Sequence, residues 1–129
     1  NCLVFMWVIS SMIPHALRVA ESWNLRYKTI AFVWDKQRIN PGNYTNPQVE
    51  VCLLFRRGRG PLPARHSTKE RQFISEMKRE HSRKPDAVRH TIERMYPDAV
   101  KLEMFARETF EGWDPWGNET DKFNRPGLF

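Results

Sequence analysis

Four apolar runs divide the chain and predict four strands. Residues 2–9 (CLVFMWVI) are continuously apolar and rich in strand-forming side chains, which is typical of a parallel strand covered on both faces. Residues 28–34 (KTIAFVW), 49–55 (VEVCLLF) and 99–105 (AVKLEMF) give the other three. We therefore expect a sheet with a buried interior.

Apolar residues recur at helical spacing between the first two strands. They are Ile13, Ala16, Leu17, Ala20 and Trp23 or Asn24. About three helical turns should pack one face on the sheet. Ser10 and Ser11 are suited to cap this helix, and Pro14 is acceptable in its first turn.

A second helix is predicted over residues 85–96. Its apolar side chains, Val88, Ile92, Met95 and Tyr96, fall at positions i, i+4, i+7 and i+8. Asp86 suits the helix N-terminus, and Pro97 ends the run.

The remaining segments are polar and are expected to be irregular. Residues 35–48 contain Asn-Pro-Gly-Asn and Asn-Pro, which is turn chemistry. Residues 56–84 form a long cationic segment, and long segments of this kind are usually functional or disordered. We expect residues 1–120 to form one domain and residues 121–129 to form a C-terminal tail.

The order strand, helix, strand, strand, helix, strand predicts an α/β sheet with right-handed connections. Ligands of such sheets bind beyond the carboxyl ends of the strands. The residues after Trp34, Phe55 and Phe105 should therefore share one edge of the sheet.

Charge and cysteine content narrow the class of protein. The 129 residues carry a net charge of +6 with a pI near 9.7, which favours an anionic partner such as nucleic acid. Cys2 and Cys52 lie in apolar runs, so we expect buried free thiols in a reducing compartment. The first apolar run is too short to span a bilayer. We expect a cytoplasmic protein without a membrane partner.

Two groups of residues could bind a small ligand. Arg107, Asn118 and Glu119 follow the last predicted strand, where polar side chains can hydrogen-bond a ribose. Ser82 and Lys84 precede the second helix, whose N-terminus attracts anions. The alternatives are ordinary surface ion pairs of Arg107 with Glu108 or Glu111, and simple capping by Ser82 beside a solvated lysine.

Aromatic and cationic side chains could bind nucleic acid. Trp34, Tyr44, Trp113 and Trp116 could stack on bases, although Trp7 and Trp34 are expected in the core and Tyr44 is expected to be exposed. The cationic segment could follow a phosphate backbone or could simply be solvated. The four histidines have no metal-site spacing, so no metal is expected.

The chain resembles the MT-A70 family of S-adenosylmethionine-dependent N6-adenine methyltransferases. The likeness covers nearly all of the chain and rests on HSRKPD before a helix, then a strand, then FAR and GWDPWGNE. It implies a Rossmann-like methyltransferase sheet in which the cofactor-binding strand follows the catalytic strand.

The resemblance also implies roles for individual residues. Lys84 would meet the methionine carboxylate of S-adenosylmethionine, and Ser82 would support its loop. Phe105 and Arg107 would border the adenosine, and Asn118 and Glu119 would hydrogen-bond its ribose and base. Tyr44 and Asn46 would belong to a loop that closes over the target adenine. Independently of the resemblance, Arg56 and Arg57 begin the cationic segment and are expected to bind the substrate there.

The family's catalytic Asp-Pro-Pro-Trp tetrapeptide does not occur in this chain. Asp114-Pro115-Trp116 stands on the cofactor side, so we do not assign it a catalytic role. The resemblance places the catalytic strand before residue 1, between the strands at 99–105 and 2–9, so we expect an incomplete sheet, a fragment of a family member and no activity of this chain alone.

Three functions follow from these patterns. The first is methyl transfer from S-adenosylmethionine to adenine N6 in DNA or RNA, in a homo- or heterodimer. The second is a non-catalytic nucleic-acid-binding subunit of a methyltransferase complex. The third, a small-molecule methyltransferase, leaves the cationic segment unexplained.

Overall fold

A computed structural model describes residues 1–123 and divides the chain into two compact units, Asn1–Pro97 and Asp98–Phe129. The backbone N–H of Phe123, in the segment predicted to be a tail, donates a hydrogen bond to the carbonyl of Arg107 at 2.8 Å. Residues 124–129 lie outside the described part of the chain.

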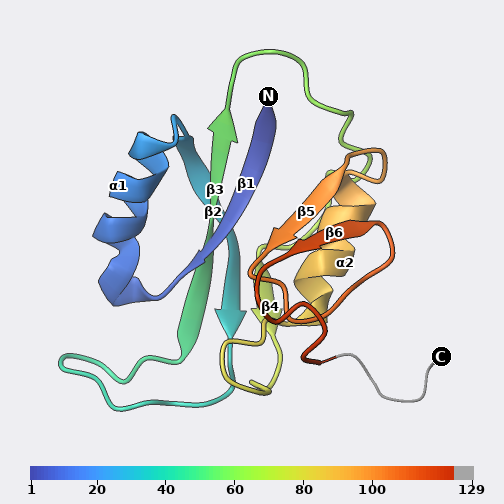
Figure 1. Cartoon of the computed structure of the whole chain (residues 1–129). Coiled ribbons are helices and arrows are strands. Elements are labelled where there is room, and N and C mark those ends of the chain that lie inside the picture. The colour runs from blue at the N-terminus through green and yellow to red at the C-terminus, as the bar shows by residue number, and fades with distance from the viewer. Residues whose placement is uncertain (124–129) are drawn as a thin grey trace. The chain divides into compact units, whose positions relative to one another are not determined.

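The first unit is built on a four-stranded sheet (Figure 1). Its strand order is β1-β3-β2-β4, comprising β1 (Cys2–Val8), β3 (Val49–Arg57), β2 (Arg26–Asp35) and β4 (Phe73–Ser75). The three longer runs are strands as predicted, and β1 lies at one edge of the sheet.

The pairing of the strands differs from the expected parallel sheet. β3 lies antiparallel to both β1 and β2, and only β4 pairs in parallel with β2. A loop without regular structure at 36–48 joins β2 directly to β3, and such a connection returns the chain in the antiparallel direction. Residues after Phe55 therefore do not share an edge with residues after Trp34, which corrects the expectation of one common edge.

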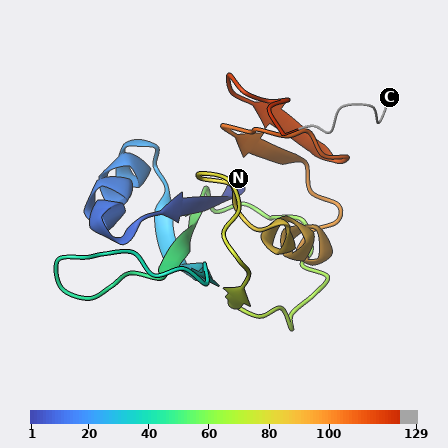
Figure 2. The ribbon, with the colours of Figure 1, turned by 90° about the horizontal axis from the view of Figure 1, so that it is seen from below.

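Helices cover both faces of this sheet (Figure 2). α1 (Ile13–Ser22) contributes Ala16 and Ala20 to a core cluster with Leu53 and Phe55. α2 (Asp86–Met95) contributes Val88 to a second cluster with Phe32 and Cys52. Neighbouring residues of β3 thus point to opposite faces, which is why its apolar run is continuous.

The start of the first helix corrects the predicted cap. Ser10–Met12 form a short 3-10 turn, η1, and α1 follows at Ile13 without a side-chain cap. Pro14 lies in the first turn of α1, as expected. On the predicted apolar face, Leu17 and Trp23 remain exposed.

Two further expectations need correction: that both cysteines are buried, and that residues 56–84 contain no regular structure. Cys52 is buried, but Cys2 is exposed because it begins β1 at the edge of the sheet. The cationic segment at 56–84 contains the strand β4, which is held on β2 partly by the hydrogen bond from the Val33 N–H to the Gln72 carbonyl at 2.9 Å.

The second unit contains a separate two-stranded sheet. β5 (Lys101–Met104), within the predicted strand at 99–105, pairs in parallel with β6 (Trp113–Trp116), which forms in a stretch expected to be a loop. Within residues 1–123, β5 pairs only with β6, and the resemblance places a strand that this chain lacks between residues 99–105 and 2–9. Pro115 fits in β6 because β6 has only one neighbouring strand in its sheet.

Candidate functional site

A pocket of about 130 Å³ lies beyond the carboxyl ends of β1, β2 and β4. We call it the lysine pocket, and its lining residues are Ile9, Trp34, Lys36, Glu50, Lys78, His81, Ser82 and Lys84. The strands β1, β2 and β4 run in the same direction, so the segments that follow them meet at one end of the sheet. This is the end at which the sequence predicted a ligand.

The centre of the lysine pocket is a carboxylate between two ammonium groups. Glu50 is 8% exposed, and its Oε1 lies 2.5 Å from Nζ of Lys84. Its Oε2 lies 3.7 Å from Nζ of Lys36. A buried carboxylate is stable only with such partners, so Glu50 fixes where both lysine side chains lie.

The pocket keeps an excess of positive charge. Three lysines line it against the single carboxylate of Glu50. Within residues 1–123, the ammonium group of Lys78 makes no ion pair. The arrangement favours an anionic or zwitterionic ligand, because a ligand carboxylate would compensate the surplus.

Two tryptophans form an apolar wall beside these charges. The rings of Trp7 and Trp34 meet edge to face at a centroid distance of 6.0 Å, and Nζ of Lys84 lies 5.6 Å from the Trp7 ring centroid. Trp34 is 2% exposed, which confirms its predicted place in the core, whereas Trp7 is half-buried. The indole N–H of Trp34 donates to the Glu76 carbonyl at 2.9 Å.

The segment before α2 does not match the alternative interpretation, in which Ser82 caps the helix beside a solvated lysine. The N-cap of α2 is Pro85, without a side-chain cap, so Ser82 does not cap the helix. Arg79 donates to the carbonyl of Lys84 at 2.7 Å and pairs with Asp86. Lys84 is thus held in an ion-pair network and is not merely solvated.

Ser82 adopts a left-handed backbone conformation with φ 61°. Such a conformation costs a non-glycine residue about 1 kcal/mol. It turns the chain between His81 and Lys84, both of which line the pocket. A strained residue at a pocket is a reason to suspect a functional constraint there.

One nucleophile beside the pocket is inert. Burial raises the pKa of the Cys52 thiol to about 12, although the ammonium group of Lys84 favours the thiolate. At neutral pH the thiol is therefore protonated and a poor nucleophile.

The loop that carries Tyr44 and Asn46 leaves the same end of the sheet. It is closed at its base by a hydrogen bond from the Lys36 N–H to the Gln48 carbonyl at 3.0 Å. Tyr44 is fully exposed, as predicted, and Asn46 is exposed beside it. Both side chains are available to a partner near the lysine pocket.

Arg56 and Arg57 lie at the opposite end of the same sheet. Arg56 is paired in register with Leu3 and Arg26, and its guanidinium donates to the carbonyl of Gly60. Arg57 is exposed. These arginines are therefore separated from the lysine pocket by the length of β3, and any contact with a shared ligand requires an extended one.

The remaining candidate residues belong to the second unit. Phe105 has φ 57° and an exposed ring that meets Trp116 edge to face at 5.3 Å. The guanidinium of Arg107 lies 4.3 Å from the Phe123 ring centroid. These aromatic contacts bring the ends of the FAR and GWDPWGNE motifs together.

Asn118 and Glu119 follow β6 in this unit, and both are exposed. Glu119 lies 2.9 Å from the ammonium group of Lys122, and that hydrogen bond lowers the pKa of the Glu119 carboxyl. The cleft predicted to join Lys84 with Arg107 and Asn118 stays a prediction.

Sequence reasoning missed Glu50, Lys36 and Lys78. The available signal was the isolated Glu50 in the apolar run VEVCLLF, since a buried charged residue needs a partner. No local pattern indicated which cation would supply it, because Lys84 follows 34 residues later.

The comparison with known proteins identifies the lineage. The MT-A70 family model matches residues 1–119. The chain belongs to the MT-A70 family. Its membership explains why the HSRKPD and GWDPWGNE motifs occur together in this order.

Proteins named as methyltransferases share this region. The chain is 44% identical over 119 residues to the Type II methyltransferase M.MunI of Mycoplasma sp, a match that covers 92% of this chain and 51% of the relative. It is 33% identical over 128 residues to an N(6)-adenosine-methyltransferase MT-A70-like protein of Arabidopsis thaliana, covering 91% and 18%. It is 41% identical over 149 residues to the human N(6)-adenine-specific methyltransferase METTL4, covering 100% and 31%.

These relatives are named methyltransferases, so the family is one of adenine N6-methyltransferases. The MT-A70 chain described here spans about half the length of the first relative and less of the others. Among the helices of residues 1–123, none has the length and apolar character needed to cross a membrane.

Proposed function

We propose that the complete protein transfers a methyl group from S-adenosylmethionine to N6 of adenine in DNA or RNA, and that the lysine pocket holds the amino-acid end of this cofactor. The observation that carries the proposal is the excess of ammonium groups in a pocket beside the HSRKPD motif of an adenine methyltransferase family.

The donor set of the pocket fits the carboxylate of an amino acid. Lys84 has three N–H donors, and one of them is directed to Glu50 at 2.5 Å. The other two can donate to a ligand carboxylate, with Lys36 and Lys78 on the same wall. The buried carboxylate of Glu50 holds Lys84 in place before a ligand arrives, which reduces the ordering cost of binding.

The cofactor, when bound, supplies an electrophilic sulfonium methyl group. The residues of this chain contribute by positioning, since a direct displacement requires the reacting atoms to be aligned. Lys84 would anchor one end of the cofactor. Phe105, Arg107, Asn118 and Glu119 would hold its adenosine.

The substrate side of the proposal rests on exposed side chains. Tyr44 presents a full ring to solvent, and such a ring can stack on a base removed from its helix. Asn46 lies in the same loop. Arg56 and Arg57 lie at the opposite end of the sheet, where they would neutralise phosphates farther along the bound nucleic acid.

Calorimetry with S-adenosylmethionine tests the cofactor site. Loss of a hydrogen bond to a charged group costs about 1.5–3 kcal/mol, so Lys84→Ala should weaken binding at least about tenfold. Lys28→Ala, an exposed lysine on β2, is the matched control and should leave the affinity unchanged. Asn118→Ala should also weaken binding. Equal affinities of wild type and Lys84→Ala would refute the assignment of the pocket.

Transfer of label from methyl-labelled cofactor to adenine tests the activity of the full-length parent. A parent that labels no adenine in either DNA or RNA would exclude the enzymatic proposal.

A non-catalytic nucleic-acid-binding subunit is the second candidate. It rests on exposed side chains that can bind nucleic acid without a cofactor, namely the ring of Tyr44 and the guanidinium group of Arg57. This alternative predicts binding to nucleic acid without binding to S-adenosylmethionine. The same calorimetry therefore separates the two functions.

A further inference from the structure

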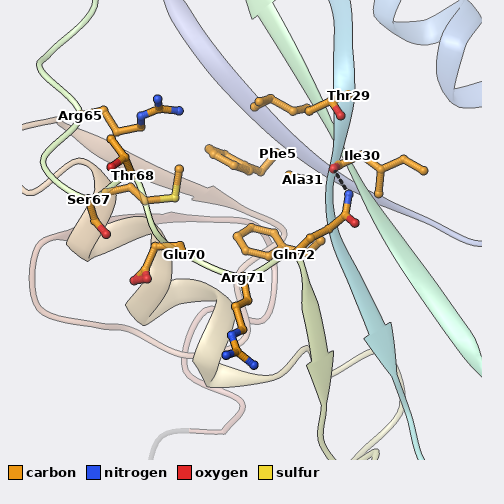
Figure 3. Close-up of a pocket in the computed structure, with 13 residues that line it drawn as sticks. Phe5, Thr29, Ile30, Ala31, Arg65, Ser67, Thr68, Glu70, Arg71 and Gln72 are labelled. Atoms are coloured by element: carbon orange, nitrogen blue, oxygen red, sulfur yellow. Dashed lines mark hydrogen bonds between the residues drawn. The ribbon is translucent and has the colours of Figure 1, made fainter.

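A second pocket, of about 210 Å³, lies on the face of the sheet that α2 covers (Figure 3). We call it the arginine pocket. Phe5, Phe32 and Met95 form apolar parts of its lining, and Arg65, Thr68 and Arg71 come from the segment at 64–72. It shares no lining residue with the lysine pocket, and its arginines belong to the cationic segment that the sequence suggested could follow a phosphate backbone.

The apolar lining is suited to a flat ring. Phe5 and Phe32 lie 6.1 Å apart between centroids, with their planes inclined by 32°. Phe32 is 3% exposed and is fixed in the core, whereas Phe5 is half-buried and adds aromatic surface to the pocket. An aromatic surface of this kind stacks on any nucleobase, because every base has a π face.

The segment that closes the pocket is attached to the fold at both ends. The His66 N–H donates to the Met95 carbonyl at 2.8 Å, at the end of α2. The Gln72 side chain donates to the Ile30 carbonyl at 2.7 Å, on β2. The pocket is therefore formed before a ligand binds.

The arginines of this segment differ from Glu70 and Gln72 in whether they have a protein partner. Glu70 is already paired with Arg94, and Gln72 is bonded to the backbone. In the part of the chain that the structure describes, the Arg65 and Arg71 guanidinium groups have no ion pair or hydrogen bond to protein. The pocket thus offers uncompensated positive charge next to an aromatic surface.

The two arginines point in different directions. Figure 3 shows the Arg65 side chain extending toward Phe5, whereas the Arg71 side chain points away from it. Arg65 is therefore the arginine directed toward a phosphate attached to a ring on Phe5. The hydroxyls of Thr29 and Thr68 also line the pocket and can hydrogen-bond the edge of a base.

We propose that the arginine pocket binds a nucleotide, with the base against Phe5 and the phosphate at Arg65. A planar ring joined to an anion is the chemistry that an aromatic wall and a free guanidinium recognise together. The nucleotide is a unit of the nucleic-acid strand held outside the methyl-transfer site. The choice of a nucleic-acid strand, and not a free nucleotide, as the source of this ligand rests on the proposed function. A free nucleotide has the same chemistry.

Fluorescence anisotropy with a labelled single-stranded oligonucleotide, in the absence of any cofactor, tests the pocket. Arg65→Ala should weaken binding about fivefold or more. It should also reduce the slope of log affinity against log salt concentration by about one, because one phosphate contact is lost. Arg71→Ala removes the same charge six residues away and should change the affinity less than twofold. Equal losses in both variants would overturn the proposal and indicate only a diffuse cationic surface.

Phe5→Leu tests the stacking contact. It keeps an apolar side chain and should weaken oligonucleotide binding about fivefold, as expected for loss of one stacked base. Unchanged binding would overturn the assignment of the base to Phe5. Circular dichroism and amide chemical shifts of each variant verify that it is folded.

Titration with a nucleoside monophosphate, followed by amide chemical shifts, separates the two sources. Shifts at residues 65–72 that Arg65→Ala abolishes, without oligonucleotide binding, would assign the pocket to a free nucleotide. Binding of neither ligand would overturn the proposal. Because no cofactor is present, this failure is distinct from failure of the calorimetric test with S-adenosylmethionine.

Discussion

The ammonium group of Lys84 lies 2.5 Å from the carboxylate of Glu50, although 34 residues separate them in the sequence. Lys84 precedes α2, and Glu50 lies near the start of β3. The pair therefore connects the segment before the helix to the end of the sheet at which the lysine pocket lies.

Glu50→Ala should lower the free energy of unfolding by about 3 kcal/mol, because removal of one partner leaves Lys84 and Lys36 close together without their counter-charge. Urea denaturation measures this change. Glu80→Gln is the control, since the pair of Glu80 with Arg83 is exposed and screened by solvent and should contribute much less to stability. Similar losses in the two variants would contradict a structural role of Glu50.

Asp35→Asn should lower stability in a pH-dependent way. Hydrogen bonds from the Gln48 side chain, the Gln37 N–H and the Ser75 hydroxyl lower the pKa of the Asp35 carboxyl from 3.8. A lowered folded-state pKa stabilises the fold above the unfolded value, and this contribution is lost as pH falls through the folded value.

The difference between wild type and Asp35→Asn should therefore be largest near neutral pH and shrink below pH 3.8. Urea denaturation at a series of pH values measures it. A difference that stays constant across the acid range would show that the charge of Asp35 does not matter.

The two thiols should differ in reactivity. Cys2 is exposed, whereas Cys52 is fully buried and burial raises its pKa to about 12. Ellman's reagent at neutral pH should modify Cys2 in the folded protein and Cys52 only after unfolding. Cys2→Ser should abolish the rapid reaction. Rapid modification of that variant would contradict the burial of Cys52.

Gly117→Ala should destabilise the second unit locally. Gly117 has φ +142°, and an added Cβ would lie 3.0 Å from Cα of Phe105. The hydrogen bond from the Ala106 N–H to the Trp116 carbonyl lies beside this contact, so amide exchange of Ala106 should accelerate about fivefold.

Gly112→Ala provides the comparison for Gly117→Ala. Gly112 also has a positive φ, +83°, but an added Cβ would meet nothing within 4 Å. Its effect on the exchange of Ala106 should be smaller. Equal effects would show that backbone conformation alone, and not the approach of Phe105, requires glycine.

Local patterns predicted the elements of the first unit well. The runs at 2–9, 28–34 and 49–55 are strands, and residues 86–95 are helical as their spacing indicated. The exposure of Tyr44 also followed from the turn residues around it. Each of these features depends on neighbours within a few positions of the chain.

The lysine pocket was only half predictable. Lys84 and Ser82 were found because they precede a recognisable helix, and both line the pocket. Glu50 was overlooked because its partners, Lys36 and Lys84, come from other segments. The side chains that complete a site are brought in by strand pairing, which no local pattern encodes.

The sequence by itself determined where strands and helices form, the cationic character of the chain and the MT-A70 motifs, because periodicity, turn chemistry and charge are properties of short segments. Tertiary structure alone decided that β3 lies between β1 and β2, that β4 forms within the cationic segment, and that β5 pairs with β6. It also decided that Glu50 meets Lys84. The physical reason is that hydrogen bonding between strands and the pairing of buried charges depend on residues distant in the chain.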